Sequence, residues 1–126
     1  MITLNNLEQF YGTENYWKNP FHPFKYTDGV KYVADEGRAY WLLDAIGSWQ
    51  IHPDIKNDHA LQEYQFWTLT VNPERSALLT CERDKGDVKI EQKIPCTDFP
   101  LEKICFYLIG MRWYRDGGVL MLPSEY

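Results

Sequence analysis

The sequence predicts an α+β fold, in which N-terminal helices pack on a C-terminal antiparallel meander sheet of about four to five strands. Two observations indicate this fold. Apolar residues recur at helical spacing before residue 50, and from Gln65 onward the apolar period is two. The 126 residues, 44% of them hydrophobic, also have the length and composition of one globular unit. We therefore expect a single domain over residues 1–126.

Three N-terminal segments have helical signals. Thr3 can cap a short helix from Leu4 to about Phe10. Asp28 and Gly29 open a helix or turn that ends at Gly37. The clearest helix is expected from Arg38 to about Gln50, because four apolar residues repeat there at i, i+3, i+4 and i+7. These residues are Leu42, Ala45, Ile46 and Trp49.

Two segments between the predicted elements have no regular pattern. Asn19–Phe24 contains two prolines, so we expect an irregular stretch that its aromatic side chains pin to the domain. Residues 51–63 are polar and predict a loop or a short extra helix. The sequence leaves open whether this second segment is ordered in the free protein.

Alternating apolar and polar residues predict the strands of the sheet. The expected strands are Phe66–Val71, Ser76–Glu82, Val88–Ile94, Ile104–Ile109 and Val119–Leu122. Turn residues at Asn72–Arg75 and Asp84–Asp87 predict hairpins. In the strand from Val88, apolar and charged residues alternate so strictly that we expect a sheet with one solvated side. A loop with Arg112, Arg115 and the pair Gly117-Gly118 precedes the last strand.

The sequence contains no recognisable catalytic motif. It lacks a nucleophile elbow, a phosphate loop and a dinucleotide fingerprint, so we predict no catalytic residue, no enzyme activity and no cofactor. The spacing of His22, His52 and His59 matches no zinc signature, and we predict no metal site.

The three cysteines form no CxxC pair, and their odd number argues against a disulfide framework. Cys81 and Cys105 lie in apolar runs and are expected to be buried. Cys96, between a proline and a threonine, is expected to be the accessible thiol.

Charge is distributed unevenly along the chain. The net charge is −5, and residues 1–63 contain nine acids but only five bases. We expect no direct binding to nucleic acid, because contacts with phosphates need a basic face. A negative face can instead steer the protein toward a basic partner. Carboxylates in a row can also occupy the places of phosphates on a basic channel. The candidate partner-binding residues, expected along one side of the helical layer, are Asp28, Asp35, Glu36, Asp44, Asp54, Asp58 and Glu63.

Seven segments spread over nearly the whole chain form a recognisable pattern: Phe10–Glu14, Tyr26–Tyr32, Ala39–Ile46, Ser48–Gln50, Phe66–Leu69, Thr97–Leu101 and Gly118–Tyr126. In these segments the chain resembles a small bacterial family of unknown function that also occurs on mobile elements. Met111–Asp116 departs from the shorter pattern expected before the last strand. The resemblance implies no catalytic residues. The family's association with mobile DNA implies only a context, in which small acidic proteins often resemble inhibitors of host defence, including anti-CRISPR proteins.

Three functional hypotheses follow. The first is a counter-defence inhibitor that mimics DNA and blocks a nucleic-acid-handling effector, such as a CRISPR nuclease, through an acidic and aromatic surface. The second is a small enzyme built around Asp28, Asp98 or a histidine. The third is a housekeeping interaction module or homodimer that uses Trp113 and Tyr114. Without a signal-peptide pattern or a membrane-length apolar run, we expect a cytoplasmic protein. The partner and the oligomeric state stay open.

Overall fold

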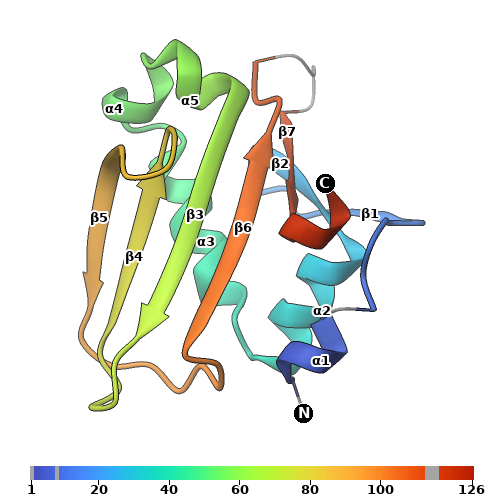
Figure 1. Ribbon diagram of the computed structural model, residues 1–126. Helices are drawn as coiled ribbons and strands as arrows, with labels where there is room; N and C mark the ends of the chain where they lie inside the picture. Colours follow the sequence, from blue (N-terminus) through green and yellow to red (C-terminus); the bar gives the residue numbers. More distant parts are fainter. Residues whose placement is uncertain (1, 8, 113–116) are drawn as a thin grey trace.

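A seven-stranded sheet, covered on one face by the two longest helices, organises the described part of the protein (Figure 1). The computed structural model describes residues 2–7, 9–112 and 117–126. In chain order, the elements are α1 (Leu4–Leu7), β1 (Tyr16–Lys18), β2 (Phe24–Thr27), α2 (Asp28–Glu36), α3 (Tyr40–Trp49), α4 (Pro53–Lys56), α5 (His59–Glu63), β3 (Tyr64–Val71), β4 (Ala77–Glu82), β5 (Val88–Ile94), β6 (Lys103–Ile109), β7 (Gly118–Met121) and the 3₁₀ helix η1 (Pro123–Glu125).

The strand order is β1-β2-β7-β6-β3-β4-β5. The predicted α+β class is confirmed, and all five expected C-terminal strands are present as β3 to β7. The sheet is larger than predicted, however, because β1 and β2 from the N-terminal part join it. The predicted meander is wrong, because β6 pairs with β3 and not with β5, the strand before it in the chain. The sheet is also mixed, since β2 pairs with β7 in parallel, with Phe24 opposite Gly118. Two parallel strands from distant segments are not joined by a hairpin turn, so no local sequence signal predicts that they pair.

Capping and backbone conformation explain the bounds of the two main helices. The Thr27 hydroxyl accepts a hydrogen bond from the Val30 backbone N–H and caps α2, which ends at Gly37 as expected. Arg38 has a φ of 50°, a left-handed conformation that is incompatible with a helical start. For this reason α3 begins at Tyr40, two residues later than predicted. Residues 51–63, predicted as a loop or short helix, contain α4 and α5.

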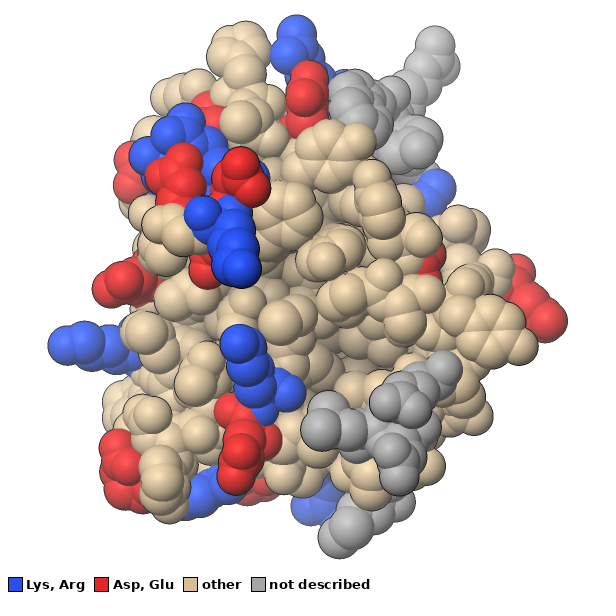
Figure 2. All heavy atoms as spheres, in the orientation of Figure 1, with Lys and Arg blue, Asp and Glu red and all other residues tan. Residues whose placement is uncertain are grey.

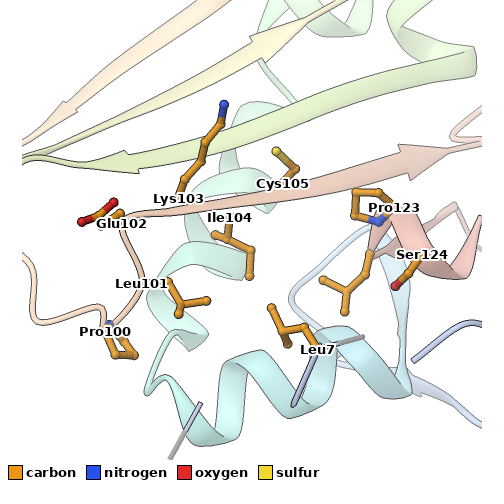
Figure 3. A pocket seen from close by; sticks show the side chains of 10 residues that line it. Leu7, Pro100, Leu101, Glu102, Lys103, Ile104, Cys105, Pro123 and Ser124 are labelled. Carbon is orange, nitrogen blue, oxygen red and sulfur yellow. The ribbon is translucent and has the colours of Figure 1, made fainter. Parts of the chain in front are cut away.

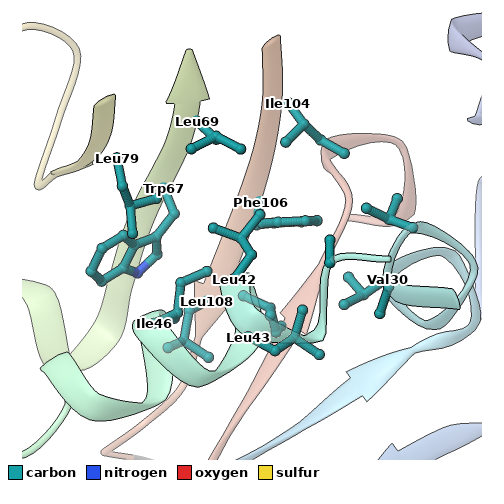
Figure 4. Close-up of a cluster of buried hydrophobic side chains, with 14 of the residues drawn as sticks. Val30, Leu42, Leu43, Ile46, Trp67, Leu69, Leu79, Ile104, Phe106 and Leu108 are labelled. Carbon is teal, nitrogen blue, oxygen red and sulfur yellow. The ribbon is translucent and has the colours of Figure 1, made fainter. Parts of the chain in front are cut away.

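The core lies between α2, α3 and one face of the sheet. From the helices come side chains such as Val30, Leu42 and Ile46, and from the strands come Trp67 and Phe106; all five are at most 1% exposed (Figure 4). Their burial supplies the main stabilisation of the fold, because apolar area removed from water contributes roughly 25 cal/mol per Å². None of the described helices combines the length and apolarity needed to cross a membrane.

A buried amide network fixes α3 against β3. The side chains of Gln50 and Gln65 exchange two hydrogen bonds, of 2.9 and 2.8 Å. Gln65 also donates to the Leu61 carbonyl and accepts from the Trp67 indole. Because these amide groups are satisfied by one another, the two glutamines can lie inside an otherwise apolar core.

The C-terminal residues are bound to the start of α2. One Glu125 carboxylate oxygen accepts hydrogen bonds from the Thr27 hydroxyl (2.6 Å) and the Leu122 N–H (3.0 Å), and the other accepts from the Gly29 N–H (3.1 Å). A carboxylate at this position complements the helix dipole. A β-carbon on Gly29 would stand 2.5 Å from that carboxylate, so the contact requires glycine.

Candidate functional site

The sheet face opposite the helices is open and is our candidate functional site. Along β3, Gln65, Trp67, Leu69 and Val71 are buried, whereas the alternate residues are half-buried or exposed. Figure 2 looks at this face: charged side chains lie mainly over β4 and β5, and uncharged ones over β3, β6 and η1. The predicted solvated side of the sheet therefore exists, but its centre is less polar than the β5 pattern alone indicates.

The strand register arranges this face in three rows that cross β4, β3 and β6. The rows are Glu82–Phe66–Tyr107, Thr80–Thr68–Cys105 and Leu78–Thr70–Lys103. The middle row contains only small side chains. Glu82, Phe66 and Tyr107 stand on one side of it, and Leu78 and Lys103 flank the small Thr70 on the other. This alternation of size makes a depression across the strands.

Two adjoining hollows, both lined by Cys105 and Pro123, form what we call the open-face groove. The smaller one lies on the open face, and the larger one lies beside the edge of β6, where Leu7 of α1 and the helix-side Ile104 also line it. The larger hollow has a volume of about 700 Å³, and Figure 3 shows Leu7, Leu101 and Ile104 converging on it. The smaller hollow has a volume of about 360 Å³. Besides the shared pair, it is lined by Phe66, Trp67, Thr68, Glu82, Asp84, Lys85 and Tyr107.

An aromatic chain borders the groove. The rings of Phe66 and Tyr107 meet edge to face with centroids 5.1 Å apart, and Tyr107 meets Tyr126 in the same manner at 5.8 Å. Such contacts hold the rings in fixed orientations. The groove therefore has a preformed wall, built in part by the C-terminal residue.

The cysteines divide between the two faces. Cys81 is buried on the helix side as predicted, and burial raises the pKa of its thiol to about 12. The prediction that Cys105 is buried is wrong: it is half-exposed in the groove, with its sulfur 3.6 Å from the Thr68 hydroxyl. An apolar run cannot show which side of a strand is covered, and this is why the prediction failed. Cys96 is exposed, as expected.

The acidic residues predicted to bind a partner lie in or beside the helices, not in the groove. Asp35, Glu36, Asp44 and Asp54 are exposed, and Asp28, Asp58 and Glu63 are half-buried. Several already have intramolecular partners. Asp35 pairs with Lys31 at 2.5 Å, and the Asp58 carboxylate caps α5 and pairs with Arg83 at 3.2 Å.

Asp28 has the most extensive set of these contacts. It accepts hydrogen bonds from the Trp17 indole (3.0 Å) and from the backbone N–H groups of Glu14 and Asn15. The indole contact is the main cause of the lowered pKa of Asp28. Asp28 thus ties the segment around β1 to α2, a role that its sequence position does not indicate.

Each of the three histidines makes its own local contact. His22 is buried, with Nε2 2.7 Å from Asp44 and with Nδ1 unpaired among the described residues. The Nδ1 atom of His52 accepts from the Asp54 N–H and caps α4, and His59 lies beside Arg112. In the described ranges, no three histidine, cysteine or acidic side chains form a metal-ligand group.

The remaining candidate residues of the sequence analysis are Asp98, Trp113 and Tyr114. Asp98 lies with Trp41 and Cys96 around a separate hollow of about 750 Å³. Trp113 and Tyr114, the candidate dimer residues, fall outside the described residues. Sequence reasoning missed Phe66, Thr68 and Tyr107 as candidate site residues, because their shared face becomes visible only from the strand register.

The model of a family described as "Family of unknown function (DUF6876)" matches residues 1–126. The predicted resemblance to a family of unknown function is thereby confirmed. No curated protein and no solved structure matches the chain.

Proposed function

Because the chain belongs to this family of unknown function, we propose a role from its structure: the protein binds another protein through the open-face groove. The observation that supports this function is the uncovered groove itself, with about 700 and 360 Å³ in its two hollows. Contiguous apolar surface that a folded domain leaves uncovered is typical of interaction sites.

The side chains of the groove suit a protein partner. Phe66 and Tyr107 contribute rigid aromatic area, which loses little conformational entropy on binding. Aromatic residues are also enriched in the buried centres of protein interfaces. The charged residues Glu82, Asp84, Lys85, Glu102 and Lys103 stand around the hollows, as in the polar rim of an interface.

Filling the groove tests this function. Thr68→Arg places a long charged side chain in the middle row, and Ser48→Arg puts the same side chain on the exposed surface of α3 as the matched control. Candidate partners captured by the wild-type protein would be purified and titrated by calorimetry. We expect Thr68→Arg to weaken binding at least about tenfold, and Ser48→Arg to leave it unchanged.

The melting temperatures of both variants show whether each remains folded. A purified partner that binds folded Thr68→Arg as tightly as the wild type would contradict the proposed site. Light scattering over a range of concentrations identifies the special case in which the partner is a second copy of the chain. In that case Thr68→Arg is expected to be monomeric.

The acidic residues support a second candidate function, a counter-defence inhibitor that mimics DNA. Asp35, Glu36, Asp44 and Asp54 are exposed, so their carboxylates are accessible to a basic channel such as that of a CRISPR nuclease. The internal ion pair between Asp35 and Lys31 weakens this candidate, since a paired carboxylate attracts a partner less strongly.

Charge reversal distinguishes the two candidates. The wild-type protein is expected to inhibit duplex binding by a purified CRISPR nuclease, and added salt should weaken this inhibition. Asp35→Lys, Glu36→Lys and Asp44→Lys combined should abolish it. In this mechanism Thr68→Arg keeps full inhibition. Unchanged inhibition by the folded triple variant would remove these acids from the proposal.

A further inference from the structure

We infer that the groove selects an extended polypeptide segment with a basic side chain at its Glu82–Asp84 end and an apolar side chain in the hollow around Leu101 and Ile104. This inference rests on the proposed function, because it names the partner chemistry of the same site. The evidence is the width of the groove, the character of its two ends and the distance between them.

The row spacing favours an extended chain over a helix. Neighbouring rows are two residues apart along a strand, or about 6.7 Å, so the outer rows lie about 13 Å apart at their α-carbons. Phe66 and Tyr107 stand on one side of that space, and Leu78 and Lys103 flank the smaller Thr70 on the other. What remains suits one extended chain, which needs about 4.8 Å beside its neighbours, and not a helix about 10–12 Å wide.

The smaller hollow suits a basic side chain. Glu82 and Asp84 contribute two carboxylates and Lys85 contributes one ammonium, which leaves an excess of negative charge. The Gly86 N–H donates to Glu82 (3.0 Å) and the Lys85 N–H donates to Asp84 (2.8 Å), so the β4–β5 turn orients both carboxylates. A carboxylate has several acceptor positions and retains capacity for a further donor.

Aromatic rings beside these carboxylates favour arginine in particular. Phe66 and Tyr107 line the same hollow as Glu82 and Asp84. A guanidinium can stack on a ring while it donates two hydrogen bonds to a carboxylate, which a lysine ammonium does less well. We therefore expect arginine to be preferred over lysine at this end.

The larger hollow suits an apolar side chain. Leu7, Leu101, Ile104 and Leu122 supply its surface, and Pro123 connects it to the smaller hollow. Its charged residues, Glu102 and Lys103, have opposite signs and attract neither charge strongly. Burial of one leucine or phenylalanine side chain from the partner is the favourable step here.

The distance between the ends sets the spacing of the two side chains. Glu82 on β4 and Cys105 on β6 are separated by two strand spacings, about 9.6 Å, and the larger hollow begins at Cys105. An extended chain advances about 3.3 Å per residue. The basic and apolar residues of the partner should therefore be roughly three to five positions apart.

Selection from a library of short random peptides displayed on phage tests the inference with the full-length protein. We expect enriched peptides to contain arginine and an apolar residue at this spacing, and Thr68→Arg to abolish the enrichment. With Glu82→Gln and Asp84→Asn combined, a synthetic enriched peptide should bind about tenfold more weakly, because shape is kept while charge is lost. Glu74→Gln, which neutralises an exposed carboxylate outside the groove lining, serves as the charge control, and melting temperatures verify that each variant is folded.

The outcomes separate this inference from the proposed function. Peptides that depend on Thr68 but lack basic residues would overturn the inference and leave the proposed function standing. If a partner protein needs the groove but no peptide is enriched, the inference is also overturned and the proposed function stands, because that partner would dock as a folded surface. If neither peptides nor partner proteins distinguish Thr68→Arg from wild type, both proposals are wrong.

Discussion

Trp67 and Phe66 are neighbours in β3, but they lie in two different environments. Trp67 is fully buried under α3 and donates its indole N–H to Gln65. Phe66 is half-buried on the open face, where its main aromatic contact is Tyr107. One face of the sheet therefore holds the fold together, whereas the other can vary or bind a partner with a smaller loss of stability.

The largest expected effect comes from truncating the two rings in turn. Trp67→Ala should reduce the free energy of unfolding by about 3–5 kcal/mol, because it leaves a cavity and removes an indole from the amide network. Phe66→Ala should cost less, about 1–2 kcal/mol, because the ring is only partly buried and loses its edge-to-face contact with Tyr107. Urea denaturation of both variants measures the difference. If both variants lose the same free energy of unfolding, the open face is part of the core.

The next effect concerns η1, which connects the two faces. Its Pro123 lines the groove, and its Glu125 accepts three hydrogen bonds next to α2. Glu125→Ala should reduce the free energy of unfolding by about 1–3 kcal/mol, because two N–H groups and a hydroxyl lose their acceptor. Glu125→Gln, which keeps an acceptor oxygen, should lose less. If both variants are as stable as wild type in urea, the C-terminal contact does not stabilise the fold.

A smaller, pH-dependent effect is expected where β1 meets α2. The pKa of Asp28 is lowered in the folded protein, chiefly by the Trp17 indole. A lowered folded pKa stabilises the protein above the unfolded pKa of about 4, and this contribution disappears as the pH falls through the folded value. The stability gap between wild type and Asp28→Asn in urea should therefore be larger at about pH 5 than at about pH 2. A gap that widens on acidification would contradict this assignment.

The smallest effect is a chemical difference that leaves stability unchanged. In the native protein, a thiol reagent should modify exposed Cys96 and half-exposed Cys105, but not Cys81, whose pKa is raised to about 12 by burial. At about pH 8 the Cys81 thiol is therefore almost entirely protonated, and the thiolate is the form that reacts. Mass spectrometry of the labelled protein identifies the sites, and denatured protein, in which all three should react, is the control. Rapid native labelling of Cys81 would mean that the helix-covered face opens.

Local patterns in the sequence predicted most elements but not their assembly. Val88–Ile94 was predicted with its observed bounds, because alternation is strict there and turn residues precede it. Phe24–Thr27 was not predicted as a strand, since its partner β7 is distant in sequence and its neighbourhood is rich in proline. Arg38, with its left-handed backbone, could not be recognised as the residue that delays α3.

The candidate site was less predictable than the fold. Phe66, Thr68 and Tyr107 are ordinary strand residues in the sequence, and only the registers of β3 with β4 and β6 bring them together. The acidic residues are recognisable in the sequence by their charge. Their positions depend on contacts, such as that between Asp28 and Trp17, that span many residues and leave no pattern.

The position of β7 between β2 and β6 has a consequence for how the protein is made. During synthesis, the N-terminal hairpin β1–β2 and the four strands β3 to β6 emerge before their common neighbour exists. Until Gly118–Met121 has left the ribosome, β2 and β6 each present an unpaired edge, the feature by which nascent chains aggregate. Translation halted before this strand would leave two half-sheets in need of protection by chaperones.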